Sequence, residues 1–121
     1  MFREALESIN GRTEGALGSL IMGTDGIAVE KLLLEDGIEA NIDVAAAEVT
    51  SLVRSAQRAG RDTGLGAVRE LILTFEGMNI IARLITADYF VVLALQPDGN
   101  LGRGRFELRK AEMDLAREFA M

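Results

Sequence analysis

The side chains that could do chemistry in this chain are few. Among 121 residues there is no histidine and no cysteine, so carboxylates, hydroxyls and one tyrosine remain as candidate acids, bases and nucleophiles. Histidine is the commonest general base and cysteine the most nucleophilic common side chain, so most acid–base and covalent mechanisms lack their usual groups. Tyr89 begins an apolar segment and Glu35-Asp36 lie in a turn-like stretch, and both fit purely structural roles. We therefore expect no catalytic residue, no metal ligand and no cofactor.

A glycine-bearing stretch, GRDTGLG at 60–66, invites comparison with phosphate-binding loops. A Walker loop ends in Gly-Lys-Ser/Thr, because the lysine and the hydroxyl serve phosphate and Mg²⁺, and a dinucleotide fingerprint needs a strand before it and a helix after it. In this chain the stretch follows a predicted helix, precedes a predicted strand and contains no lysine. The sequence therefore predicts a connecting loop at 60–66 and no nucleotide site.

Charge and hydropathy restrict the partners. The formal net charge is −6, which argues against nucleic acid because phosphate contacts need a concentrated basic surface. The longest apolar run, 89–95, is far short of the roughly 20 residues that span a bilayer, and charges interrupt the first ten residues. We expect a cytoplasmic protein of one domain, 1–121, that neither inserts into membranes nor binds nucleic acid, and whose partners are proteins.

Three consecutive antiparallel strands are predicted between Arg69 and Leu95. Glu76-Gly77 supplies a tight hairpin connection, since the glycine can adopt positive φ. The last strand, 89–95, is apolar at every position and therefore needs cover on both faces. This requirement predicts that it is central in its sheet, with helices above and below.

The remaining elements follow from periodicity and turn signals. An opening amphipathic helix is predicted to end at Asn10-Gly11, and a hairpin to turn at 23–26. After a break at 35–37, a long helix is predicted from Asn41, its N-cap, to Ala59, and a closing helix follows the turn at 96–100. The predicted class is α+β, an α/β sandwich in the order helix-β-β-helix-β-β-β-helix with one five-stranded antiparallel sheet.

Two charge patterns leave alternatives open. The long helix is acidic in its first half and then carries Arg54, Arg58 and Arg61, which either complements the helix dipole with solvated charges or presents a striped surface to a partner. Arg103 and Arg105 fall in the first turn of the closing helix, where the dipole disfavours positive charge. Solvent exposure explains them, and recognition of an anion or a carboxylate is the alternative hypothesis.

Two large apolar residues of the closing helix leave a further alternative open. Phe106 and Met113 either reach the flank of the sheet or are exposed contact residues.

Several segments in sequence order resemble the roadblock family, named after the dynein light chain, over nearly the full chain. The segments are GALGSLIMGTDGIAVE, the long helix, RELILTFEGMNIIARLI, DYFVVLAL and PDGNLGRGRFELRKA. The turn Thr24-Asp25-Gly26 and the helix start Asn100-Leu101-Gly102 are the most telling local matches. The GTDGIAVE stretch is most similar to the bacterial members that work with the small Ras-like GTPase of gliding motility and cell polarity.

The resemblance implies a profilin-like roadblock fold and a dimer. In this family the third strand of each protomer pairs with its mate across a twofold axis, and the second helices lie side by side. Carried onto this chain, strand 69–75 and helix 41–59 form the interface. A long apolar edge strand left open is also an aggregation hazard that pairing removes. The implied interface residues are Arg69, Leu71, Leu73 and Phe75 on the strand and Val49, Leu52, Val53 and Ala56 on the helix.

The resemblance also implies a function without catalysis. Family members are platforms whose paired helices receive a small GTPase, another roadblock protein or a scaffold, and some stimulate GTP hydrolysis without donating an arginine finger. A finger from Arg54, Arg58 or Arg61 stays open on chemical grounds. The first expectation is a dimeric regulator of a Ras-like GTPase, and the alternative is an adaptor that leaves hydrolysis unchanged. The predicted partner-facing residues are Glu48, Ser51, Arg54, Ser55 and Arg58.

Overall fold

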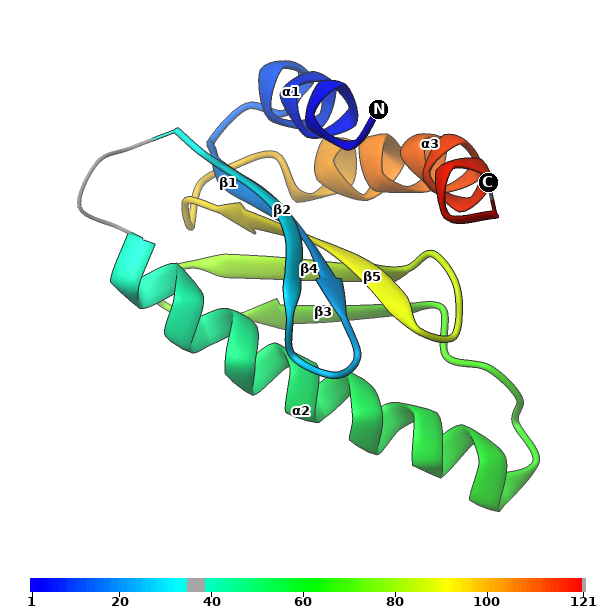
Figure 1. Cartoon of the computed structure of the whole chain (residues 1–121). Helices are drawn as coiled ribbons and strands as arrows, with labels where there is room; N and C mark the ends of the chain where they lie inside the picture. Colours follow the sequence, from blue (N-terminus) through cyan, green and yellow to red (C-terminus); the bar gives the residue numbers. More distant parts are fainter. Residues whose placement is uncertain (35–38, 121) are drawn as a thin grey trace.

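The computed structural model describes residues 1–34 and 39–120, and over these residues it confirms the predicted order of elements (Figure 1). Three helices and one five-stranded antiparallel sheet make up this part of the chain, an α+β fold. The elements are α1 (Phe2–Arg12), β1 (Ala16–Gly23), β2 (Ala28–Leu33), α2 (Glu39–Thr63), β3 (Glu70–Thr74), β4 (Asn79–Leu84), β5 (Tyr89–Leu95) and α3 (Leu101–Ala120).

Strand β5 is central, as its apolar sequence predicts. The strand order is β2-β1-β5-β4-β3, and every neighbouring pair is antiparallel. Side chains of β5 alternate between two separate cores: Phe90, Val92 and Ala94 belong to one, and Val91, Leu93 and Leu95 to the other. Two hydrophobic layers therefore meet along this one strand.

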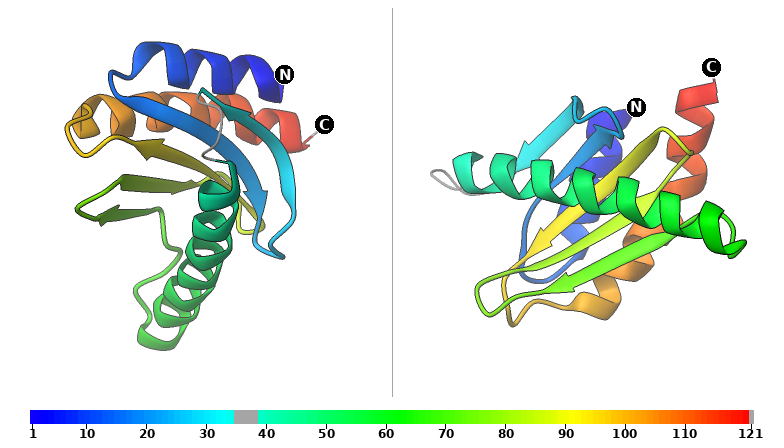
Figure 2. Two further views of the ribbon diagram at one scale, coloured as in Figure 1. Left: turned by 90° about the vertical axis from the view of Figure 1, so that its left-hand side faces the viewer. Right: turned by 90° about the horizontal axis from the view of Figure 1, so that it is seen from below.

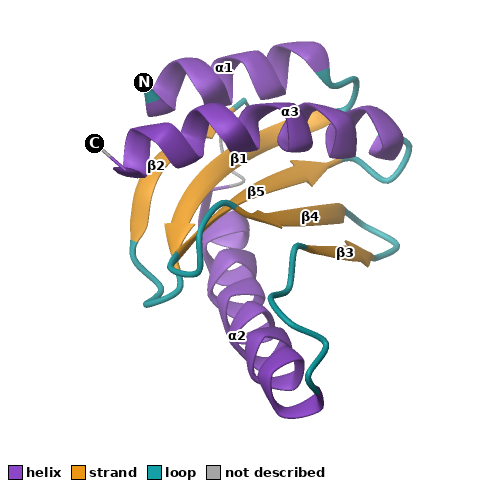
Figure 3. Ribbon diagram, turned by 90° about the vertical axis from the view of Figure 1, so that its right-hand side faces the viewer, coloured by secondary structure: helices purple, strands orange, loops and turns teal. Residues whose placement is uncertain are grey.

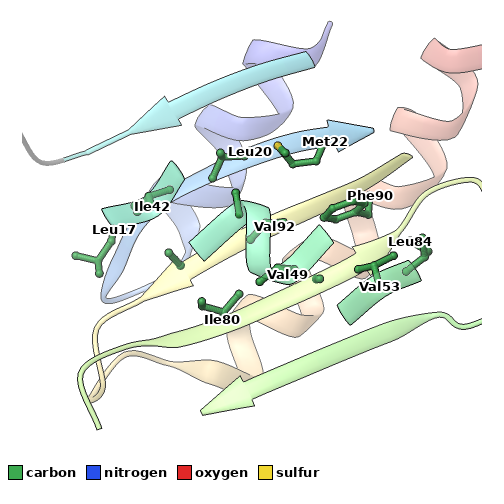
Figure 4. Close-up of a cluster of buried hydrophobic side chains, with 13 residues drawn as sticks. Leu17, Leu20, Met22, Ile42, Val49, Val53, Ile80, Leu84, Phe90 and Val92 are labelled. Atoms are coloured by element: carbon green, nitrogen blue, oxygen red, sulfur yellow. The ribbon is translucent and has the colours of Figure 1, made fainter. Parts of the chain in front are cut away.

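The helices divide between the two faces of the sheet. Helix α2 crosses one face alone, whereas α1 and α3 lie together on the other (Figures 2 and 3). Under α2, Val49 and Val53 pack with Leu20, Phe90 and Val92 (Figure 4). On the opposite face, the core comprises Leu6 and Ile9 of α1, Leu108 and Leu115 of α3, and Ile21, Ile81, Val91, Leu93 and Leu95 of the sheet.

Local chemistry sets the turn at 23–26 and the start of α3. Asp25 Oδ1 accepts a hydrogen bond from the Ile27 amide at 3.0 Å, and Gly26 adopts φ +90°, which favours glycine. Asn100 Oδ1 accepts from the Arg103 amide at 2.9 Å and so caps α3. Tyr89 stacks on Phe119 with ring centroids 4.0 Å apart, so it is the packed aromatic that the sequence suggested.

Helix α1 does not end where the sequence predicted. It continues through Asn10-Gly11 to Arg12. Asn10 is buried, and its Nδ2 donates a hydrogen bond to the Leu32 carbonyl at 3.1 Å. The side chain therefore joins the helix to β2 instead of stopping the helix.

The predicted ends of α2 are also wrong. The helix begins at Glu39, which places Asn41 inside it and not at the N-cap, and it ends at Thr63 and not at Ala59. Gly60 continues the helix, and Gly64 at φ +74° follows its last residue. The first half of the predicted 60–66 loop is therefore helical. The predicted break at 35–37 lies outside the described residues.

Two helical glycines should respond in opposite directions to replacement by alanine. A Cβ at Gly60 would lie 2.1 Å from the Gly66 carbonyl oxygen, whereas a Cβ at Gly11 would meet nothing within 4 Å. Gly11→Ala should raise the free energy of unfolding by about 0.5–1 kcal/mol through helix propensity. Gly60→Ala should lower it, because the backbone contact must open. Urea unfolding of both variants measures this, and a stabilised Gly60→Ala protein would contradict the close approach.

Candidate interaction surface

Strand β3 is an open edge of the sheet. Within 1–34 and 39–120 it pairs with β4 alone. The amides of Leu84 and Phe75 donate to the carbonyls of Arg69 and Met78, each at 2.9 Å, so the residue pairs at both ends of the β3–β4 ladder are hydrogen bonded. Because such pairs alternate with non-bonded pairs, Leu71 and Leu73 bond to β4. The N–H and C=O groups of the alternate residues then point to the open edge.

Those edge-facing backbone groups belong to Glu70, Ile72 and Thr74. They are centred on Ile72, whose side chain is exposed. The side chains of Leu71 and Leu73 point to the α2 face, where both are half-buried against the core beneath α2. Arg69 and Phe75, the other two residues predicted for this edge, are exposed just outside the strand. A second chain could therefore pair with this edge without displacing any existing hydrogen bond.

Helix α2 presents a narrow stripe of small apolar residues beside its buried face. Ala45, Leu52, Ala56 and Ala59 recur at intervals of seven, four and three residues, which places them along one side of the helix. Leu52 is 43% exposed, Ala45 and Ala56 are half-buried, and Ala59 is exposed. Ala45 and Met78 line the same small gap beneath α2, beside the β3–β4 turn. The stripe therefore borders the same side of the molecule as the end of β3.

Val49 and Val53, which the resemblance assigned to the interface, face the sheet of their own chain. Their exposed fractions are 2% and 0%, and both belong to the core beneath α2. Of the four helix residues named, Leu52 and Ala56 are the ones left accessible to a second chain.

The five residues predicted to face a partner are all exposed, and their spacing of three or four residues places them along the side of α2 that is turned away from the sheet. Glu48 and Ser55, seven residues apart, flank the stripe on the side of Leu52. Ser51 and Arg58, also seven apart, lie on the outermost face, where Arg58 Nη2 donates to Ser55 Oγ at 3.4 Å. Arg54 lies further round the helix, away from the stripe.

The last turns of α2 project past the sheet (Figure 2). A cleft of about 510 Å³ lies beside this part of the helix. Gln57 and Arg61 of α2 line it together with 66–69, 84–87 and Glu112. Gln57 Nε2 donates to the Ala87 carbonyl at 2.8 Å and so ties the helix to the β4–β5 turn. The sequence did not predict this cleft, because Arg61, which lines it, was expected in a loop beyond the predicted helix end at Ala59.

A network of ion pairs supports β3 on the α3 side, and the sequence did not predict it. Glu70 and Arg83 are cross-strand partners, each 13% exposed at the side chain, with Arg83 Nη1 3.8 Å from Glu70 Oε1. Arg83 Nε bonds to Glu112 Oε1 at 2.8 Å. Arg105 Nη2 bonds to Glu70 Oε2 at 2.9 Å. The carboxylate that Arg105 recognises is therefore in its own chain, and the same holds for Arg103, which pairs with Glu107 at 2.7 Å.

The described residues offer no metal site and no bilayer-spanning helix. No group of three or more His, Cys, Asp or Glu side chains in 1–34 and 39–120 could hold an ion. In the same ranges no helix is both long and apolar enough to cross a membrane.

Comparison with known proteins places this geometry in a family. No family model and no curated protein matches the chain. Solved structures do: MglC from Myxococcus xanthus is 35% identical, with a TM-score of 0.74 over 97% of this chain and 98% of that one. A Roadblock/LC7 domain from Streptomyces avermitilis gives a TM-score of 0.84 at 13% identity over 98% and 97% of the two chains. The gliding protein MglB from Thermus thermophilus gives 0.79 at 19% identity, over 95% and 85%.

The fold with its open β3 edge is that of a roadblock domain, and the similarity to MglC extends over almost the whole of both chains. The chain belongs to the roadblock family, as its sequence motifs indicated.

Removing Arg83 should destabilise the protein far more than removing Arg105. Arg83→Met leaves the carboxylates of Glu70 and Glu112 without their shared cation in a largely buried site, and should lower the free energy of unfolding by about 2–3 kcal/mol. Arg105→Met removes a side chain that is 43% exposed, and should cost less than about 1 kcal/mol. Chemical denaturation measures both values, and equal losses would contradict the ranking.

Proposed function

We propose that this chain forms a homodimer by pairing β3 with β3 of a second copy. The supporting observation is the open edge, where the backbone groups of Glu70, Ile72 and Thr74 have no partner strand among the described residues. A twofold antiparallel pairing centred on Ile72 joins these groups and continues the sheet from one copy into the other. Such pairing also removes the aggregation hazard of an apolar edge.

The stripe on α2 gives the same dimer a second contact. Alanines at 45, 56 and 59 let two helices approach closely, and Leu52 supplies a larger apolar side chain between them. The contact would bury apolar surface that each protomer leaves in water. The outer faces of the two helices, with Ser51 and Arg58, then form one continuous surface.

This paired-helix surface is proposed to receive a small Ras-like GTPase, in bacterial motility or polarity. The similarity to MglC and to the gliding protein MglB supports this assignment. The protein has no chemistry of its own in this role, and it stabilises one nucleotide state or stimulates hydrolysis through contacts. The alternative is an adaptor that binds another roadblock protein or a scaffold and leaves hydrolysis unchanged.

Proline at position 72 should separate the dimer without unfolding the protomer. The amide of Ile72 points to the open edge, so its loss spares the ladder with β4, and proline is tolerated on edge strands. Ile72→Pro should therefore be a folded monomer by light scattering and circular dichroism at micromolar concentration. Ile72→Val keeps the amide and should stay dimeric. A dimeric Ile72→Pro protein would contradict pairing through β3.

A second experiment separates regulator from adaptor and tests for an arginine finger. The purified protein is mixed with the Ras-like GTPase of the same organism, loaded with GTP or GDP, and co-elution and phosphate release are followed. A regulator forms a complex in at least one nucleotide state. If Arg54, Arg58 or Arg61 acts as a finger, its replacement by alanine should reduce stimulated hydrolysis by about 10³-fold or more, whereas a docking contact should reduce it about tenfold or less. No complex in either state would eliminate the regulator.

A further inference from the structure

Helix α3 carries a basic and apolar face on the side that points away from the sheet. We call it the α3 outer face, and its residues recur at helical spacing opposite the buried Leu108 and Leu115. Two large apolar side chains lie on it accessible to water, Phe106 at 51% and Met113 at 71% exposure. The α3 outer face consists of Arg103, Phe106, Arg109, Lys110 and Met113.

The ring of Phe106 is held between two cations. Arg103 Cζ lies 5.2 Å from the ring centroid and Lys110 Nζ lies 5.9 Å from it, both within the range of cation–π attraction. The same two cations share Glu107, at 2.7 Å from Arg103 Nη2 and 3.6 Å from Lys110 Nζ. Glu107 is only 2% exposed, so it anchors both cations from beneath while their heads stay in water. The two cations therefore hold the aromatic ring in a defined position at the surface.

The α3 outer face contains three cations and no carboxylate of its own. Among the carboxylates of α3, Glu107 lies beneath Arg103 and Lys110, Asp114 pairs with Arg117, and Glu112 binds Arg83 of the sheet. Arg109 is exposed and has no ion pair within 1–34 and 39–120. In a chain of net charge −6, this face is thus locally basic around an exposed aromatic ring.

We propose that the α3 outer face binds an acidic segment of a partner protein, with an aromatic or aliphatic side chain of that segment against Phe106 and Met113. Arg109 has no ion pair among the described residues, and Arg103 and Lys110 share a single carboxylate, so the face keeps positive charge beside two apolar side chains. Arginine, methionine and aromatic residues are also typical of interface centres. The face runs about 15 Å along the helix, the length of a short peptide. It lies on the layer opposite α2, so it is independent of the proposed dimer and GTPase surface.

A lipid or nucleic acid surface fits these observations less well. Each basic residue contributes only about 1 kcal/mol at an anionic membrane, and the remaining surface of an acidic protein is repelled by it. Two apolar side chains bury too little area for stable insertion. A short acidic peptide, by contrast, meets only the local charge, because salt screens the rest of the molecule beyond about 8 Å.

The test is a selection from randomised twelve-residue peptides displayed on an array, probed with the whole protein. The selected sequences should be acidic and contain a large apolar residue, and their affinity should fall as salt rises. The double variant Phe106→Ala/Arg109→Glu should weaken these peptides at least about tenfold, as loss of a central contact does. Arg12→Glu makes the same charge change at an exposed site on α1 and should leave affinity within about twofold. Lys110 and Arg103 are kept because they neutralise the buried Glu107.

Four results of the binding experiments would overturn the proposal. They are the absence of selected peptides, selected peptides without acidic residues, equal binding by the double variant, and sedimentation with phosphatidylserine vesicles that depends on Phe106 and Arg109. A change in solution mass of the double variant would also overturn it, since the face would then bind a second copy. Circular dichroism confirms that the double variant is folded. The Ile72→Pro experiment is unaffected by any of these results, so the two proposals fail separately.

Discussion

One constraint organises this molecule: strand β5 is apolar on both faces and must be buried from both sides. This burial requires two layers of helix, and the chain supplies α2 on one face and α1 with α3 on the other. It also favours a central position for β5. The observed pairings place β1 and β4 beside β5, and β2 and β3 at the two edges of the sheet. The outward faces of the helices follow from this covering of β5, and the open edge follows from the pairing of β3 with β4 alone among the described residues.

The two layers differ in what they leave exposed. Helix α2 covers its face of the sheet alone, and its buried residues come from one narrow strip that includes Ile42 and Val53. The alanine stripe with Leu52 lies beside that strip and remains accessible. On the other layer, α1 packs beside α3, and the outward side of α3 keeps its basic residues around Phe106. Each layer thus offers a surface of distinct chemistry, small and apolar on α2, basic and aromatic on α3.

The sequence predicted the order of elements, the central strand and the edge strand, because the hydropathy pattern of each segment indicates its secondary structure and its burial. The predicted ends of α1 and α2 were wrong, because contacts with distant residues determine where these helices end. Asn10 has the sequence signature of a helix stop, but its amide bonds to Leu32 on a different element. Gly60 likewise signals a loop, but it is needed within α2 because the Gly66 carbonyl approaches it closely.

Surface features that depend on register could not be predicted at all. Glu70 and Arg83 are 13 residues apart and meet only because the β3–β4 register places them opposite each other. Arg105 reaches Glu70 from a distant helix. The predicted interface residues Val49 and Val53 lie on the same helix as Leu52, and periodicity alone does not tell which side faces the sheet. The proposed contact surface could therefore be assigned to an element from the sequence, but not to individual residues.

Backbone amide hydrogen exchange in the unmodified protein tests the central claim most directly, that β3 joins two copies edge to edge. In a single protomer the amides of Leu71 and Leu73 are bonded to β4, whereas those of Ile72 and Thr74 point to the open edge. Pairing through β3 predicts that Ile72 and Thr74 are protected as well, and that their protection weakens as the protein is diluted. Rapid exchange at Ile72 and Thr74 beside protected Leu71 and Leu73, at every concentration, would contradict it.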